Sequence, residues 1–268
     1  MQRIIACILA VIAWIFSDII NPLMVELKLP QLLNPTAKID MSQFELVWHD
    51  EFTGSVLRPE WISYKEDDHL VLEDGKLHIK TSLVENEDGT VSVKTGAINT
   101  SGLDSDWRRV KEGYWQTYGY FEIRCKFADG LGIWSAFWIY AGAGSELDVF
   151  EAWHAKSEDK FKRESFETTV HYNYYNGNDS LGRFHAADCY DEFHTYGVEW
   201  NEEWYIFYID GNEFARSNAN GDGTSAIPQY ITVNNAQGDD VRCGKPADNL
   251  PGHPTDYVID YVRCYQYK

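Results

Sequence analysis

The 268-residue chain has few basic side chains, because 23 lysines and arginines stand against 42 aspartates and glutamates, for a formal net charge of −19. Phosphate binding needs clustered lysine and arginine, so this balance weighs against a nucleic-acid partner. The same negative field should repel polyanionic substrates. Hydrophobic residues make up 44% of the chain, which is enough for a folded core and argues against disorder.

The N-terminal apolar run, Ile4–Phe16, is too short to span a bilayer comfortably. It follows Arg3 and has the length of the apolar part of a secretory signal peptide. We therefore expect residues 1–20 to be a signal peptide, or a membrane signal anchor if uncleaved, and the protein to be secreted or held at the cell surface. Residues 21–42 are rich in proline without a steady period and predict a linker, which leaves residues 43–268 as one domain.

Cysteine is scarce, with five in the chain, and Cys7 lies in the N-terminal apolar run. In an exported protein the other four can form one or two disulfides, with three possible pairings. Buried free thiols are the alternative, and the spacing does not suit a zinc site. These four are Cys125, Cys189, Cys243 and Cys264.

The sequence also lacks a helical period, since no stretch repeats apolar residues every 3.6 positions over three turns. Many short segments instead alternate as strands do; in residues 121–127, Phe121 and Cys125 share an apolar face while Arg124 lies on the polar one. Asp-Gly pairs at 74–75 and 210–211 predict hairpin turns. About a dozen short strands without helices predict an all-β sandwich of two sheets.

Three acids stand close together in SELDVFEAW, namely Glu146, Asp148 and Glu151. Side chains alternate along a strand, so Glu146 and Asp148 share a face, whereas the odd offset turns Glu151 to the other one. A single β-bulge between Asp148 and Glu151 returns Glu151 to the face of the other two. The spacing therefore predicts a bulge.

Three carboxyl groups on one face repel one another, so a purely structural role for them is hard to find. Glycoside hydrolysis needs two carboxyl groups beside one bond, at about 5–5.5 Å in retaining enzymes and about 6.5–9.5 Å in inverting ones. Two glutamates on one short strand fit the retaining distance better. Asp148 could share a hydrogen bond with the nucleophile and keep the pKa of the acid raised. The alternative is a solvated acidic edge strand, but the flanking Trp138 and Trp153 favour a sugar cleft.

Beyond the three acids, residues 44–268 resemble glycoside hydrolase family 16, the group of laminarinases, agarases and carrageenases. Ordered blocks carry the resemblance, among them VWHDEFTG, YGYFEIRCKFADGLGIWSAFWIY, ELDVFEAW, TVHYN, VNNAQG and IDYVRCYQY. It implies a β-jelly roll of two curved antiparallel sheets with a concave substrate cleft. It also implies that Glu146 is the nucleophile, Glu151 the acid and base, and Asp148 a residue that assists Glu146. The two-residue gap before Glu151 matches the bulged branch of the family.

The resemblance further implies aromatic sugar-binding residues. Trp134 and Trp138, four residues apart and thus on one strand face, match a tryptophan pair before the catalytic strand; the alternative is that either belongs to the core. Trp153 shares the face of Glu151 and is expected to be a sugar platform. The sequence departs from a typical laminarinase in the segment LDSDWRRVKEGYWQT, which carries Trp107, Arg108, Arg109 and Trp115. We expect this segment to roof part of the cleft and set specificity, with Trp115 as a substrate-binding residue.

Polar residues also match family positions. Arg124, His171 and Asn234 correspond to cleft residues, although a surface salt bridge suits Arg124 nearly as well and a lone histidine is more often structural. Some relatives bind one calcium ion on the outer sheet, and Asp260 and Glu51 match that region; the alternative for Asp260 is a hydrogen-bonding strand residue. No cofactor is expected to be required for catalysis.

We expect a monomeric, endo-acting retaining hydrolase of a polysaccharide, with β-1,3 or mixed-linkage glucan as the first choice of substrate. A neutral galactan or galactose-containing glycan stays open, and sulfated polymers rank lower because the chain is acidic. A transglycosylase shares the covalent intermediate and differs only in its acceptor. A noncatalytic lectin-like module on the same fold needs the aromatic residues but not both glutamates.

Overall fold

The computed structural model describes residues 37–65, 67–104, 106–141, 145–153, 163–173 and 175–268. The expected signal segment and most of the expected linker lie outside them. Residues 37–39, which belong to the last part of that linker, are hydrogen-bonded to the domain. Ile39 N donates to Gly211 O at 2.9 Å, and Glu213 N donates to Ala37 O at 2.8 Å. The folded domain therefore begins before residue 43. No helix in the described residues is long and apolar enough to cross a membrane.

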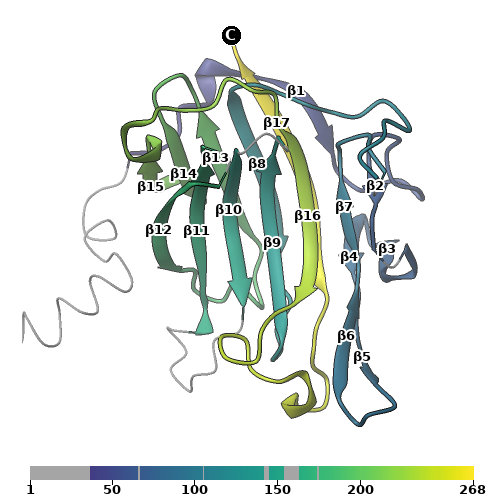
Figure 1. Cartoon of the computed structure of the whole chain (residues 1–268). Coiled ribbons are helices and arrows are strands. Elements are labelled where there is room, and N and C mark those ends of the chain that lie inside the picture. Colours follow the sequence, from purple (N-terminus) through teal and green to yellow (C-terminus); the bar gives the residue numbers. More distant parts are fainter. Residues whose placement is uncertain (1–36, 66, 105, 142–144, 154–162, 174) are drawn as a thin grey trace, which may run out of the picture.

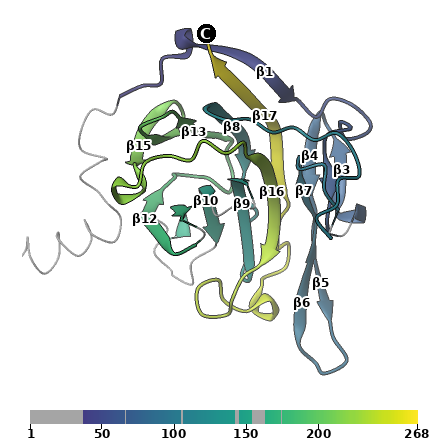
Figure 2. The same ribbon diagram turned by 45° about the horizontal axis from the view of Figure 1, so that its top comes forward.

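Two antiparallel sheets pack face to face, as Figures 1 and 2 show. The outer sheet has the order β15 (Asn212–Ser217), β14 (Tyr205–Ile209), β13 (His194–Trp200), β8 (Gly119–Lys126), β17 (Tyr257–Tyr267), β4 (Lys76–Ile79) and β3 (Leu70–Glu73), and β1 (Phe44–Asp50) also pairs with β17. The cleft sheet has the order β12 (Gly177–His185), β11 (Ser165–Tyr172), β10 (Glu146–Trp153), β9 (Ile133–Tyr140), β16 (Tyr230–Gln237), β7 (Ala97–Asn99) and β2 (Ile62–Ser63).

A separate hairpin of β5 (Thr81–Glu85) and β6 (Val91–Thr95) projects from the sandwich in both views. The described residues include four 3-10 turns, η2 (Met41–Gln43), η3 (Asp67–His69), η4 (Ala219–Gly221) and η5 (Pro246–Asp248). The predicted all-β, two-sheet class is confirmed.

The two predicted Asp-Gly turns join β3 to β4 and β14 to β15. Both residues of each pair have positive φ, with 52° and 69° at Asp74 and Gly75 and 49° and 73° at Asp210 and Gly211. Positive φ at both central positions is what a type I′ hairpin requires, and the twist of that turn matches the twist of the strands.

Alternation along the strands fills the space between the sheets. In β8, Phe121, Ile123 and Cys125 are fully buried in one core cluster that also holds Leu147 and Phe150 of β10. The core side chains therefore pack against the inward face of β10, and the other face of this strand is left for the cleft. The four described cysteines are buried and free, so of the two alternatives left open by the sequence the structure has the free thiols.

Candidate active site

Strand β10 contains the predicted bulge. Against β11, Asp148 pairs with Thr169 and Glu151 with Glu167, so a three-residue step on β10 faces a two-residue step on its neighbour. The extra residue leaves both Val149 and Phe150 in the core. The Thr168 hydroxyl donates to Val149 O at 3.0 Å and so satisfies a carbonyl beside the break in the ladder. With the bulge in place, the three acids lie on the cleft face.

Glu146 has two polar neighbours. The Tyr175 hydroxyl donates to Glu146 Oε2 at 2.6 Å, and His171 Nε2 lies 3.9 Å from Oε1. Burial, and then the negative charge of Asp148, raise the pKa of Glu146, while Tyr175 and His171 oppose this rise. The two neighbours therefore stabilise the ionised carboxylate that a nucleophile needs.

Asp148 is the most deeply placed of the three acids, with 6% of its side chain exposed. Its Oδ2 lies 3.2 Å from His171 Nε2, and this hydrogen bond is the main cause of a raised pKa at His171. Within the described residues, Asp148 thus pairs with His171, not with Glu146 through the shared hydrogen bond that we expected. His171 thus lies beside both carboxylates, where the resemblance implied a cleft histidine, and a role for it in binding substrate stays a prediction.

Glu151 differs from the other two acids because none of the described residues places a cationic side chain within ion-pair distance of it. Burial is the main cause that raises its pKa to about 8, followed by the charges of Asp148, Glu167 and Glu146. Glu151 is therefore protonated at neutral pH and can donate a proton. The direction of the Asp148 effect is the one expected from the sequence. Ala136 lies opposite Glu151 on β9, and its small side chain leaves room above that part of the sheet.

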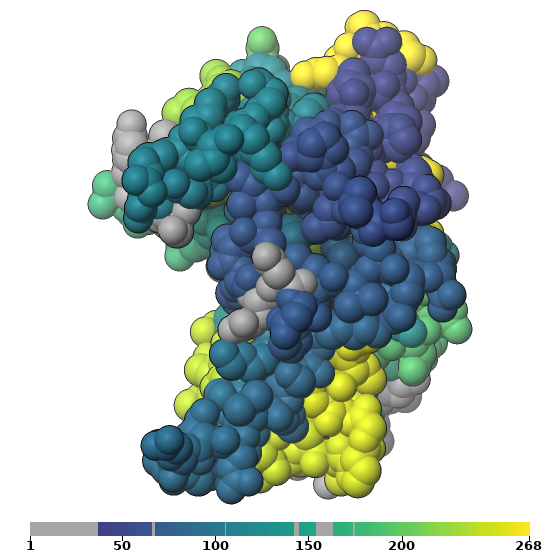
Figure 3. Space-filling model, turned by 90° about the vertical axis from the view of Figure 1, so that its right-hand side faces the viewer, coloured from purple at the N-terminus to yellow at the C-terminus, as the bar shows by residue number. Residues whose placement is uncertain are grey.

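A cavity of about 960 Å³ lies beside Glu146. Its wall includes Lys65, Asn99 and Lys111, but aromatic rings supply most of the large side chains. They are Trp61, Tyr64, Trp107, Trp138, Tyr140, Tyr175 and Tyr230. Many aromatic faces with a few polar groups suit a sugar, which presents C–H faces and hydroxyl edges. In Figure 3 the segment around residue 107, in teal, overhangs a hollow on the left.

Residues 73–262 match the sequence profile of glycosyl hydrolases family 16. The chain belongs to this family. It is 34% identical over 171 residues to the endo-1,3-1,4-beta-glycanase EglC of Rhizobium meliloti, an alignment that covers 62% of this chain and 34% of that protein. It is 27% identical over 253 residues to a beta-glucanase of Rhodothermus marinus, covering 84% and 86% of the two chains.

Among solved structures, the family 16 enzyme SCLam, a non-specific endo-beta-1,3(4)-glucanase, superposes with a TM-score of 0.69 at 26% identity. That comparison covers 88% of this chain and 95% of the other. This chain spans about a third of the length of EglC. The family and the jelly-roll fold expected from the sequence are thus confirmed.

Three positions predicted from the sequence, Trp134, Trp138 and Asn234, lie on neighbouring strands of the cleft sheet. Trp134 and Trp138 lie on one face of β9, and Trp138 Nε1 donates to Asn234 Oδ1 of β16 at 2.7 Å. Trp138 also lines the cavity beside Glu146. Asn234 therefore orients the indole ring of Trp138, and substrate binding by either residue stays a prediction.

Trp153 is not an open platform. It is 2% exposed, its ring centroid lies 4.6 Å from that of Trp134, and the Arg183 guanidinium lies 4.6 Å from its ring. Arg242 lies 4.5 Å from the Trp134 ring on the same stack. The prediction of a sugar platform at Trp153 is wrong because neighbouring side chains cover its faces. Alternation along the strand predicted the face of β10 on which Trp153 lies, but it could not predict that Arg183 and Arg242 pack over that face.

Arg124 lies on the outer sheet, away from the cleft. Its Nη1 donates to Asp260 Oδ2 at 2.5 Å, and its guanidinium lies 4.9 Å from the Phe193 ring. The cleft assignment is wrong, and the alternative of a surface salt bridge holds. Because β8 belongs to the outer sheet, the face that carries Arg124 is turned away from the cleft.

The two carboxylates expected at a calcium site are each engaged by an arginine. Asp260 pairs with Arg124, and Glu51 accepts from Arg263 Nε and Nη2, both at 2.8 Å. Neither belongs to a group of three or more candidate metal ligands in the described part of the chain. These side chains, as arranged, do not fit a calcium ligand set, and a calcium ion bound through backbone carbonyls stays a prediction.

Trp115 lies outside the cavity. Its Nε1 donates to Ser101 O at 2.8 Å and its ring packs edge-on against Tyr230, with 4.8 Å between centroids. The substrate-binding assignment to Trp115 is wrong. Trp107 of the same segment lines the cavity instead.

Sequence reasoning also missed Tyr175. It reaches Glu146 because Asn173 and Tyr175, with φ of 51° and 62°, turn the chain back after β11. Asn173 in the TVHYN block is a residue type that tolerates this conformation, and together with Asn176-Gly177 it was an available signal of a turn.

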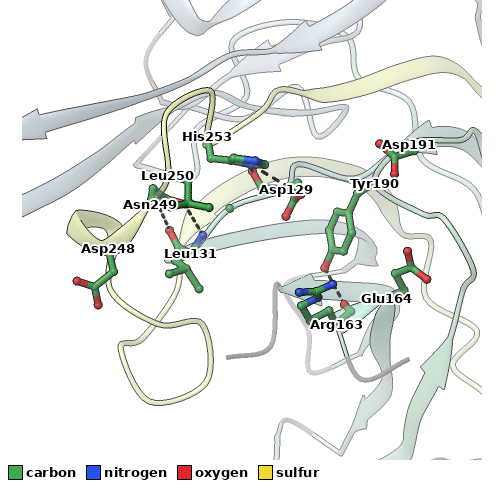
Figure 4. A pocket seen from close by; sticks show the side chains of 11 residues that line it. Asp129, Leu131, Arg163, Glu164, Tyr190, Asp191, Asp248, Asn249, Leu250 and His253 are labelled. Carbon is green, nitrogen blue, oxygen red and sulfur yellow. Dashed lines mark hydrogen bonds and ion pairs between the residues drawn. The ribbon is translucent and has the colours of Figure 1, made fainter. Parts of the chain in front are cut away.

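A second cavity, of about 360 Å³, lies elsewhere, and Figure 4 shows its lining. Its polar groups bond largely to one another: Tyr190 donates to Arg163 O at 2.9 Å, and the Asn249 side chain bonds the backbone of Leu131 at 2.7 and 2.8 Å. His253 lies 3.7 Å from an Asp129 carboxylate oxygen. This cavity holds none of the three acids, so the chemistry belongs to the cleft beside Glu146.

Proposed function

We propose that the protein is a retaining, endo-acting hydrolase of β-1,3 or mixed-linkage β-glucan. The observation that carries the proposal is the bulged strand β10, which places an acid protonated at neutral pH, Glu151, on one face with Glu146. The names of the relatives EglC and the R. marinus beta-glucanase support glucan as the substrate.

In the first step, a Glu146 carboxylate oxygen attacks the anomeric carbon and the glycosidic C–O bond breaks. Glu151 gives its proton to the departing oxygen, so the leaving chain departs as a neutral alcohol. In the second step, Glu151, now ionised, takes a proton from water, and the water oxygen displaces Glu146 from the same carbon. Two inversions at one carbon give net retention.

The electrostatic arrangement favours this exchange of roles. The negative charge of Glu146 is one cause of the raised pKa at Glu151. Once Glu146 is esterified by the sugar, that charge is gone, and the pKa of Glu151 falls. A group that was an acid in the first step thereby becomes a base in the second.

Product analysis with the full chain tests the proposal. Mixed-linkage β-glucan, laminarin and a neutral β-galactan are incubated separately with the protein and with Glu146→Gln. We expect a rapid fall in glucan viscosity with oligosaccharides of intermediate length, and loss of activity in the variant by at least about a thousandfold.

The alternatives appear as distinct outcomes. Cleavage of galactan without cleavage of glucan would show that the substrate is a galactan. Products longer than the starting chains would identify a transglycosylase. Binding without cleavage would indicate a lectin-like module. Full activity of Glu146→Gln would remove the nucleophile assignment, and an inverted anomeric signal in fresh product by NMR would contradict retention.

We also propose that the protein acts outside the cytoplasm as a monomer. The apolar run Ile4–Phe16 after Arg3 supports export, and a polymeric glucan is met outside the cell membrane. Fractionation of cells that express the full chain, with sedimentation analysis of the purified protein, tests both statements. Protein confined to the cytoplasm, or a stable dimer, would contradict the corresponding one.

A further inference from the structure

The segment between β7 and β8 forms a wall at one side of the cleft. Its base is closed by backbone hydrogen bonds, from Tyr114 N to Thr100 O at 2.8 Å and from Val110 N to Gly102 O at 2.9 Å. Leu103 and Arg109 form an isolated antiparallel bridge further out. The segment is thus a paired loop with a defined position, which Figure 3 shows in teal above the hollow.

Asp104 fixes the tip of this loop. One of its carboxylate oxygens accepts from Asp106 N at 3.0 Å and from Arg108 N at 2.9 Å, and its other oxygen accepts from Arg108 Nε at 3.1 Å. Asp104 N donates to Arg108 O at 2.9 Å, and Trp107 N donates to Asp104 O at 3.0 Å. The backbone of Trp107 is therefore held on both sides.

Trp107 is an unusual residue for the position it holds. Its φ is +62°, in the left-handed region that glycine and asparagine adopt readily and that other residues avoid. Its side chain is 59% exposed, so burial does not offset this backbone conformation. Strained residues on well-determined loops gather at functional sites. Stability alone would favour glycine here.

The indole ring faces the cleft and extends its aromatic lining. Trp107 lines the cavity beside Glu146, and its ring centroid lies 6.2 Å from that of Tyr140. Tyr140 in turn lies 5.5 Å from Trp138 and pairs with Glu146 across strands β9 and β10. The rings therefore form a path that leads outward from the nucleophile.

We propose that Trp107 is an outer sugar platform, which stacks on the C–H face of a neutral hexopyranose ring beyond the ring that Glu146 attacks. This inference rests on the proposed function. It adds that the cleft prefers long glucan chains, which reach the tip of the loop, over short ones. Trp107 is then a specificity-determining residue and touches no reacting atom.

The variant Trp107→Gly separates this role from a structural one. Glycine adopts the same φ without strain, so we expect an unchanged or higher melting temperature. For mixed-linkage β-glucan polymer we expect KM to rise about tenfold, the effect of losing one stacked ring, with kcat within twofold. For the shortest oligosaccharide that the protein cleaves, kcat/KM should not change. Trp107→Phe should restore part of the affinity for the polymer.

Trp115→Phe is the matched control, because Trp115 belongs to the same segment but packs on Tyr230 outside the cavity. It should lower the melting temperature, through loss of the hydrogen bond to Ser101 O, without changing the ratio of kcat/KM between polymer and short substrate. An unchanged KM for polymer in Trp107→Gly, or an equal loss on all substrates with a lower melting temperature, would overturn the proposal.

Binding measurements keep the test separate from the proposed activity. Calorimetry with a mixed-linkage hexasaccharide compares the protein and its Trp107→Gly variant, each carrying Glu146→Gln. Weaker binding in the variant, together with no hydrolysis by the native protein, would support the platform and refute the hydrolase. Hydrolysis by the native protein with equal binding by both variants would refute the platform alone.

Discussion

Glu167 should tune the acid of the cleft, and Glu167→Gln tests this directly. Glu167 lies opposite Glu151 on β11 and follows Asp148 among the charges that raise the pKa of Glu151 to about 8. The charges that face Glu167 are Arg183 on β12, at 3.8 Å, and Arg242 from the loop after β16. Removing the negative charge of Glu167 must lower the pKa of Glu151.

The size of the shift follows from the register. Side chains directly opposite on antiparallel strands have Cβ atoms about 5 Å apart. Two unit charges about 6 Å apart at an effective dielectric constant of about 20 interact with about 2.8 kcal/mol, or about two pKa units. Arg183 offsets part of this, and 34% of the Glu167 side chain is exposed and screened by solvent. We therefore expect a shift of about one unit.

The assay is kcat/KM on mixed-linkage β-glucan between pH 4 and pH 10. The alkaline limb reports loss of the Glu151 proton, so in Glu167→Gln it should move down by about one pH unit, while the acid limb stays within about 0.3. Glu213→Gln is the control, because Glu213 also pairs with an arginine but lies on β15 of the outer sheet. An alkaline limb that stays in place or moves up would refute this account of Glu151.

Three further predictions concern the site and the core. Tyr175→Phe removes the hydrogen bond to Glu146, so kcat/KM should fall about tenfold with the acid limb moved to higher pH; an unchanged profile would contradict the role given to Tyr175. The folded-state pKa of Glu151 lies above its unfolded value, so ionisation destabilises the folded protein as pH rises from about 4.5 to 8. Glu151→Gln should therefore raise the melting temperature by several degrees at pH 9 and leave it unchanged at pH 4, and equal effects at both would contradict this. In a Cys7→Ser background, the native protein should show no reactive thiol and the unfolded, unreduced protein four; two or none after unfolding would indicate disulfides.

The sequence predicted the fold class and the bulge because these follow from alternation and offsets along single strands, whereas the expectation for His171 came from the family resemblance. The odd offset of Glu151 permits one simple solution, and β10 adopts it. The hairpin turns are also local, because Asp-Gly pairs favour the positive φ values that a two-residue hairpin turn requires.

Contacts that depend on how strands pair were not predictable in the same way. Alternation showed that Arg124 lies on a polar face, but which sheet β8 joins decides whether that face lines the cleft or meets solvent. Glu167 raises the pKa of Glu151 because the register of β11 against β10 puts the two residues opposite each other, and the spacing of residues along the chain does not reveal that register. Trp107 and Trp115 look alike in sequence, and the hydrogen bonds of one loop separate their roles.

The bulge in β10 also restricts how such a protein can evolve. Pairing with β9 resumes in step after the extra residue, since Asp148 faces Trp138 and Glu151 faces Ala136. Deleting one residue would thus keep the sheet and the three acids. It would, however, remove one of the two adjacent core side chains, Val149 or Phe150. The loss of Phe150 would remove ring contacts with Phe127, Phe137 and Tyr196. A large-to-small core change costs about 2–5 kcal/mol. A change in the number of residues between Asp148 and Glu151 is therefore tolerated only when the core changes with it. We expect proteins with the bulged strand and proteins with the shortened strand to have evolved separately for this reason.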